Sequence, residues 1–92
     1  MARYRVMRWQ DIPAQVKADD AQGGRSSREL PPWFAQEIDR VAMRDGLAGT
    51  DAYLEAWAWS RPVEMPGTAE EVVDAVIRSL CEEWGRPIDG EG

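Results

Sequence analysis

The short segment from Gly23 to Arg28 carries the groups best suited to binding a small anion. Backbone N–H groups at the two glycines stand beside hydroxyl and guanidinium groups, all of which can donate hydrogen bonds to an anion. The segment also precedes an expected helix, whose N-terminus attracts negative charge. A flexible glycine-rich loop is the alternative interpretation, because no specific phosphate-binding motif is present. The candidate anion-binding residues are Arg25, Ser26, Ser27 and Arg28.

Aromatic side chains form a second candidate site, one suited to protein contacts. Trp57 and Trp59 fall at alternate positions of one expected strand, and Trp9 ends another, so the three can share one sheet face. Tryptophan is enriched among the residues that dominate protein interfaces. An aromatic core, or a face covered by loops, explains the same pattern. The expected interaction face comprises Met7, Trp9, Tyr53, Trp57 and Trp59.

Groups for covalent or acid–base catalysis are sparse. The sequence has no histidine, which excludes Ser-His-Asp and Cys-His arrangements and Cys/His zinc sites within this chain. The single cysteine, Cys81, lies between apolar residues and two glutamates, which favours a structural thiol. Asp51 and Glu55 are most simply solvated surface carboxylates. We therefore expect no enzyme activity, no metal site and no cofactor.

Composition and charge limit the classes of partner. A chain of 92 residues with 43% hydrophobic residues is enough for one domain with one core. The net charge is −6, and the half after residue 45 has three basic and ten acidic side chains, which argues against nucleic acid and anionic membranes. No apolar stretch is long enough to span a bilayer, and no signal peptide is apparent. With one cysteine and no internal disulfide, the expected location is the cytoplasm.

The elements that must position these groups follow the order β-β-α-β-α. Residues 3–9 and 15–18 are expected to form a hairpin interrupted by Pro13, with its second strand at a sheet edge. A helix should begin at residues 31–32 and end before Gly46, since proline favours first turns and glycine favours helix ends. Residues 53–60 predict a third strand and 61–67 a loop. A second helix should begin at a capping box formed by Thr68 and Glu71 and end at Gly85.

This order predicts an α+β fold with a small, mainly antiparallel three-stranded sheet and two helices packed on one face. Residues 1–88 are expected to form a single domain, and 89–92 a flexible C-terminal tail. Because both helices cover the same face, the face with the tryptophans can lack cover from within the chain.

Three stretches resemble a small bacterial family known as "virulence factor" proteins, in the stand-alone form of a C-terminal domain of conserved virulence factor C-like proteins. They are the run Arg3-Tyr4-Arg5-Val6 … Trp9-Gln10-Asp11-Ile12-Pro13-Ala14-Gln15-Val16-Lys17, residues 28–34 and residues 46–57. The resemblance covers nearly the whole chain and supplies no catalytic residues. The family-motif candidates are Gln10, Asp11, Pro13, Lys17, Thr50, Asp51 and Glu55.

The resemblance implies an accessory module that works on or within another protein. Larger relatives join the same domain to helical repeats and an iron–sulfur-scaffold-like module, and stand-alone members lie near folate- and corrinoid-dependent one-carbon genes. We therefore expect a non-catalytic subunit whose aromatic sheet face docks on a larger protein or forms a homodimer. The alternative is a small anionic-ligand-binding protein that uses the segment Gly23–Arg28.

Overall fold

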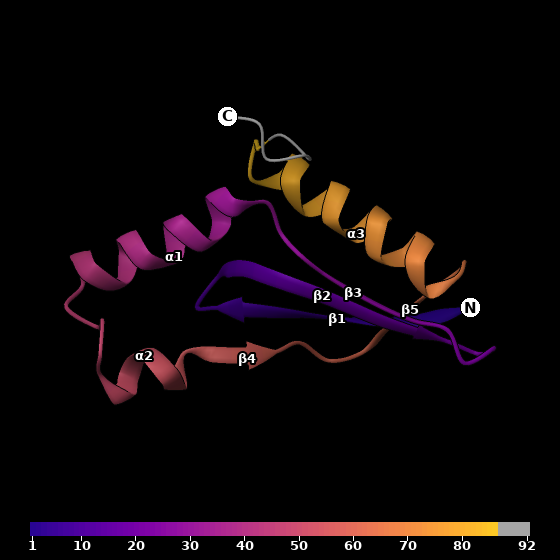
Figure 1. The fold of residues 1–92 in the computed structure, drawn as a ribbon, viewed down its shortest axis with the longest axis horizontal. Helices are drawn as coiled ribbons and strands as arrows, with labels where there is room; N and C mark the ends of the chain where they lie inside the picture. Colours follow the sequence, from indigo (N-terminus) through magenta and orange to yellow (C-terminus); the bar gives the residue numbers. More distant parts are fainter. Residues whose placement is uncertain (87–92) are drawn as a thin grey trace.

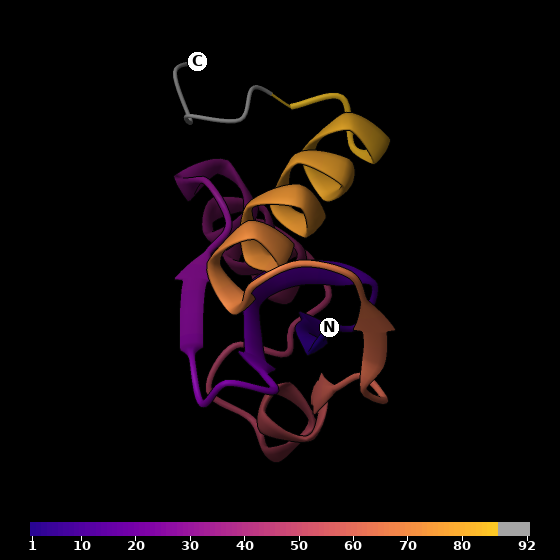
Figure 2. The ribbon, with the colours of Figure 1, turned by 90° about the vertical axis from the view of Figure 1, so that its right-hand side faces the viewer.

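A computed structural model describes residues 1–86 and shows a five-stranded antiparallel sheet with three helices, which confirms the α+β class (Figure 1). The elements in order are β1 (Ala2–Trp9), β2 (Ile12–Asp20), β3 (Arg25–Glu29), α1 (Pro32–Arg44), α2 (Asp51–Glu55), β4 (Trp57–Trp59), β5 (Val63–Met65) and α3 (Ala69–Glu83). Helix α3 lies on one side of the sheet and α2 on the other (Figures 1 and 2). The expected tail at 89–92 lies outside the described residues.

Strand β1 is the centre of the sheet. One of its edges pairs with β2, which pairs in turn with β3. Its other edge pairs with β4 opposite residues 7–9 and with β5 opposite residues 2–4. The sequence-based expectation that the second strand lies at an edge is therefore wrong, because β3 occupies that position.

Pro13 lies inside β2 although the strand is central. The β1–β2 register shifts between Met7 and Arg8, which pair with Gln15 and Pro13 respectively and leave Ala14 as the extra residue of a bulge. A bulge is one of the few sheet positions that tolerates a residue without a backbone N–H. The carbonyl of Ala14 faces β3 and accepts a 3.0 Å hydrogen bond from Leu30 N–H, which continues the β2–β3 pairing and anchors the chain entering α1.

Three segments differ from the sequence-based expectation. Residues 25–29, expected as a loop, form edge strand β3, whose polar side chains give no apolar alternation to detect. Residues 53–60, expected as one strand, divide into the end of α2 and strand β4. The cause of the second difference is Thr50, whose hydroxyl accepts a hydrogen bond from Tyr53 N–H and begins a helical turn. The loop expected at 61–67 contains strand β5.

The two long helices begin and end where the sequence predicts. Helix α1 starts at Pro32 and ends in a glycine cap, with Leu47 N–H bonded to Ala42 O at 2.7 Å and Gly46 at φ +71°. Helix α3 starts at the Thr68–Glu71 capping box. The buried side of α3 covers the β1–β2 face with valine, isoleucine and leucine, each contributing roughly 1.5–3 kcal/mol through burial. The buried residues of α3 are Ala69, Val72, Val73, Val76, Ile77, Leu80 and Cys81.

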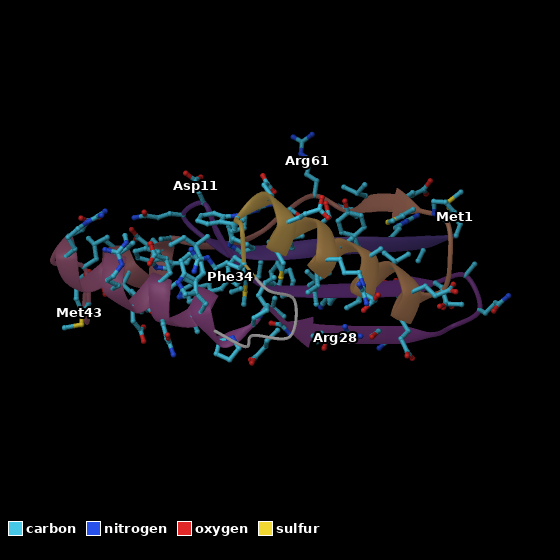
Figure 3. The ribbon with its side chains drawn as sticks, turned by 90° about the horizontal axis from the view of Figure 1, so that it is seen from above. Met1, Asp11, Arg28, Phe34, Met43 and Arg61 are labelled. Atoms are coloured by element: carbon cyan, nitrogen blue, oxygen red, sulfur yellow. The ribbon has the colours of Figure 1, made fainter. Side chains whose placement is uncertain are left out.

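An aromatic cluster joins the start of α1 to the end of α3. The Phe34 ring is fully buried, and its centroid lies 5.1 Å from that of Trp33 and 6.0 Å from that of Trp84. Figure 3 shows Phe34 where the two helices approach each other. The Arg86 guanidinium lies 4.3 Å from the Trp33 ring centroid, a cation–π contact that covers the cluster from outside.

Asp20 fixes the opposite end of α3 to the sheet. Its carboxylate accepts hydrogen bonds from Gln22 and Gly24 in the β2–β3 turn and from Ala69 N–H in the first turn of α3, at 2.8–3.0 Å. These backbone donors, led by Ala69, lower the pKa of Asp20. One side chain therefore shapes a turn and caps a helix 49 residues away in sequence.

Candidate functional site

A groove of about 490 Å³ opens where the sheet meets α1 and α2, and we refer to it as the α1–α2 groove. Its floor is mainly apolar, and its lining includes two amide side chains, two carboxylates, one tyrosine and one tryptophan. The lining residues are Met7, Ala14, Gln15, Glu29, Leu30, Pro32, Ala35, Gln36, Ile38, Asp39, Tyr53 and Trp57. The volume falls within the 300–1,000 Å³ typical of binding sites for small molecules or anchoring side chains.

Helix α2 and strand β4 hold the aromatic wall of this groove. Thr50 caps α2 and places Tyr53 against Trp57, with ring centroids 6.2 Å apart and planes nearly perpendicular. Trp57 pairs with Trp9 across β1 and β4. Both Tyr53 and Trp57 are half-buried, so part of each ring contacts the core and part remains accessible in the groove.

Trp9 does not belong to an accessible interaction face. Its side chain is 0% exposed, its ring centroid is 5.6 Å from that of Tyr53, and its indole N–H donates a 2.9 Å hydrogen bond to Tyr53 O. Helix α2 therefore covers this end of the sheet face that was expected to lack cover. This end of the face was expected to lack cover because the alternate spacing of the aromatic residues predicted a strand. That spacing does not reveal the helical turn at residues 51–55.

Trp59 and Met7 remain nearer the surface, on the uncovered part of the same sheet face. They are direct cross-strand partners. Trp59 is 39% exposed, and the Lys17 ammonium lies over its ring, 5.0 Å from the centroid. Of the five predicted interaction residues, Met7, Tyr53 and Trp57 line the α1–α2 groove, while Trp59 lies outside it and Trp9 lies beneath it.

The family-motif candidates are not gathered into one site. Pro13 is buried at the bulge and Thr50 caps α2. Asp51 and Glu55 lie exposed at the two ends of α2 rather than beside a long strand. Gln10 and Asp11 form the exposed β1–β2 turn, where Gln10 has a φ of +54° and its N–H donates to Ala56 O at 3.2 Å. The remaining candidate, Lys17, lies on the uncovered sheet face.

The four candidate anion-binding residues are likewise divided, because successive residues of β3 point to opposite faces. Arg28 faces α3 and forms an ion pair with Asp74 at 3.3 Å (Figure 3). The Asp74 carboxylate has a lowered pKa because it accepts hydrogen bonds from Arg78 and, secondarily, from Arg28. Arg25, Ser26 and Ser27 nevertheless line one hollow of about 440 Å³ together with Lys17 and Asp19. Three of the four expected residues therefore share a hollow, and Arg28 lies apart from them on the α3 side.

Cys81 is fully buried, and this burial raises the pKa of its thiol. Within residues 1–86, no three His, Cys, Asp or Glu side chains are grouped as metal ligands would be. No helix of that range combines the length and apolar character that crossing a membrane requires.

Fold and groove together define a small α+β domain with a largely apolar surface groove. The chain belongs to the virulence factor family, whose family model matches residues 7–86. No curated protein and no solved structure matches the chain significantly.

The three stretches that carry the family resemblance meet in the α1–α2 groove. Ala14 and Gln15 come from the first stretch, Leu30 and Pro32 from the second, and Trp57 from the third. Sequence reasoning missed the contribution of α1, in particular Ala35, Ile38 and Asp39. Residues 28–34 were the available signal in the sequence. This stretch leads into α1 and so places the helix beside the other two stretches.

Proposed function

We propose that this protein is a non-catalytic accessory subunit that binds a larger bacterial protein through the α1–α2 groove. The observation that carries the proposal is the meeting of all three family-like stretches at this one apolar hollow. The candidate partner is an enzyme of folate- or corrinoid-dependent one-carbon metabolism, and a cytoplasmic location forms part of the proposal. These two points depend on the family resemblance and on the cysteine content of the sequence.

The lining of the groove suggests the chemistry of the partner segment. Its apolar floor, including Leu30, Ile38 and Trp57, suits one or two apolar anchor side chains. The carboxylates that line it, Glu29 and Asp39, are both exposed. Acidic groups around an apolar floor favour a partner segment in which Lys or Arg flanks the apolar anchor, since opposite charges steer association and fix register.

Affinity capture with matched variants tests this proposal. Ala35 is exposed on α1 and lines the groove, so Ala35→Arg should fill the groove without disturbing the core. Ala52→Arg introduces the same side chain at an exposed position of α2 that does not line the groove. We expect the tagged protein to capture a specific partner from native lysate, Ala52→Arg to retain it and Ala35→Arg to lose it, at unchanged thermal stability.

A tryptophan pair separates the groove from the rest of the aromatic surface. Trp57→Ala removes a groove wall, whereas Trp59→Ala alters the same strand two residues away on the uncovered face. Partner capture should be lost with the first change and kept with the second. Retention by both Ala35→Arg and Trp57→Ala would refute the groove as the docking site. If no other protein is captured and the mass of the protein in solution is that of two chains, the protein forms a homodimer instead.

A further inference from the structure

The uncovered face of the sheet carries two neighbouring rows of side chains that differ in the balance of positive and negative charge. Residues directly opposite each other on paired strands share a face. The first row crosses β3, β2, β1 and β5 and alternates in sign: Arg25, Asp19, Arg3 and Glu64. Arg3 and Glu64 approach to 3.8 Å. In this row each acidic residue has a basic cross-strand partner.

The second row has no acidic member. Ser27 on β3 is opposite Lys17 on β2, and Lys17 is opposite Arg5 on β1. Beyond Arg5, β1 faces the segment Ser60–Pro62 between β4 and β5, which adds another arginine and no carboxylate. Figure 3 shows that Arg61 points away from the sheet. Within residues 1–86, neither Lys17 nor Arg5 has a carboxylate within ion-pair distance.

Arg5 and Lys17 are like charges at directly opposite positions of β1 and β2. Side chains directly opposite in an antiparallel pair lie about 5 Å apart at Cβ, and like charges there are destabilising. The chain as a whole has a net charge of −6, so this pair is not part of a generally basic surface. Trp59 holds the Lys17 ammonium over the face by a cation–π contact at 5.0 Å. Trp59 thus fixes the position of the Lys17 ammonium, and the same face of β2 also carries the carboxylate of Asp19 two residues further along.

A hollow of about 280 Å³ lies beside this pair, lined by Arg3, Arg5, Lys17, Asp19 and Pro62. Its cations come from two different strands. Arg offers a planar fork of N–H donors, and Lys a compact charge with three donors. A carboxylate carries one negative charge on two oxygens, whereas a phosphoryl group carries up to two charges on three terminal oxygens and so suits two cations with several donors better.

We propose that the hollow beside Arg5 and Lys17 binds the phosphoryl group of a small molecule. Arg5 and Lys17 supply the main charge, and Arg3 supplies a further donor that is shared with Glu64. Bound phosphate removes the repulsion between the two cations, so binding and stability are coupled. The site lies on the uncovered sheet face and is separate from the α1–α2 groove proposed for the protein partner.

Thermal unfolding of the full chain tests this site. Inorganic phosphate and glycerol phosphate are each compared with chloride at matched ionic strength. For the wild type, about a ten-fold excess of anion over its dissociation constant should raise Tm by roughly 5–10 °C. Arg5→Gln and Lys17→Gln should each bind phosphate about ten-fold more weakly or worse. Arg78→Gln makes the same charge change on the exposed side of α3 and should respond like the wild type.

The Tm of Arg5→Gln measured without added anion provides a second, decisive test. Relief of like-charge repulsion predicts a Tm equal to or above that of the wild type, whereas a structural role for Arg5 predicts a lower one and would overturn the proposal. Equal phosphate responses in Arg5→Gln and Arg78→Gln would also overturn it, as would no response at all. A larger effect of glycerol phosphate than of inorganic phosphate identifies a phosphomonoester as the ligand, and the reverse identifies free phosphate. Partner capture should be unchanged in Arg5→Gln, so this site and the groove can fail independently.

Discussion

At the scale of single residues, Asp20 has the most connected polar side chain in the described chain. One carboxylate accepts three backbone N–H groups, two in its own turn and one at the start of α3. Hydrogen bonds to a charged acceptor are about twice as strong as those between neutral groups. The ionised carboxylate of Asp20 therefore contributes to the stability of the folded structure.

Asp20 should make stability depend on pH in the acidic range. Its pKa is lowered on folding from the ordinary value of 3.8, so its contribution is complete above that value and is lost as pH falls through the folded pKa. Asp20→Asn should be less stable at neutral pH and should lose less further stability on acidification than the wild type. Urea unfolding from about pH 7 to about pH 2 measures both effects.

The matched control is Asp11→Asn, which changes an exposed carboxylate in the other hairpin turn. Asp74 and Glu37 also have lowered pKa values, so the difference between variant and wild type is needed to isolate the contribution of Asp20. Parallel stability–pH curves for wild type and Asp20→Asn would contradict the assigned role.

At the scale of elements, the β2–β3 turn depends on Gly24 for a reason other than backbone freedom. A Cβ at Gly24 would lie 2.5 Å from Asp20 Oδ2, in the place that the carboxylate needs. Gly24→Ala should therefore displace the Asp20 carboxylate from Ala69 N–H and lower the free energy of unfolding. Gln22→Ala, in the same exposed turn, should be nearly neutral. Urea unfolding measures both, and an equally stable Gly24→Ala would contradict the coupling.

Elements with strong local signals could be predicted from the sequence, and those defined by tertiary context could not. The limits of α1 and α3 follow from Pro32, Gly46 and the Thr68–Glu71 capping box. Strand β3 has no apolar side because one face meets water and the other meets α3 through Arg28 and Asp74. Strands β4 and β5 have three residues each, too few for a period to be visible.

The candidate site was predicted in part for the same reason. Tyr53 and Trp57 were recognisable as aromatic candidates, but their spacing suits a strand, and only the Thr50 cap reveals the turn that moves Tyr53 over Trp9. The Arg5–Lys17 pair was invisible because it depends on register between two strands. Register follows from the bulge at Ala14, which no local pattern marks.

At the scale of the whole molecule, Cys81 reports on the cooperativity of the core. Its side chain is 0% exposed among the core residues of α3, and burial raises the pKa of the thiol. A thiol reagent at neutral pH should therefore label Cys81 only when the core opens. The logarithm of the labelling rate should rise in Asp20→Asn and Gly24→Ala in proportion to their loss of stability. Rapid labelling of the stable wild type would contradict a single cooperative core.

The division of one sheet edge into β4 and β5 limits how the protein can associate. Strands of three residues on either side of Ser60–Pro62 offer an incoming strand no continuous ladder, and Pro62 has no N–H to donate. The opposite edge, β3, is continuous but has charged side chains at three of its five positions, which discourages strand addition. The chain is thereby protected against fibril-like growth. Association is therefore favoured at the faces of the sheet and helices rather than at the sheet edges. The α1–α2 groove and the Arg5–Lys17 pair lie on those faces.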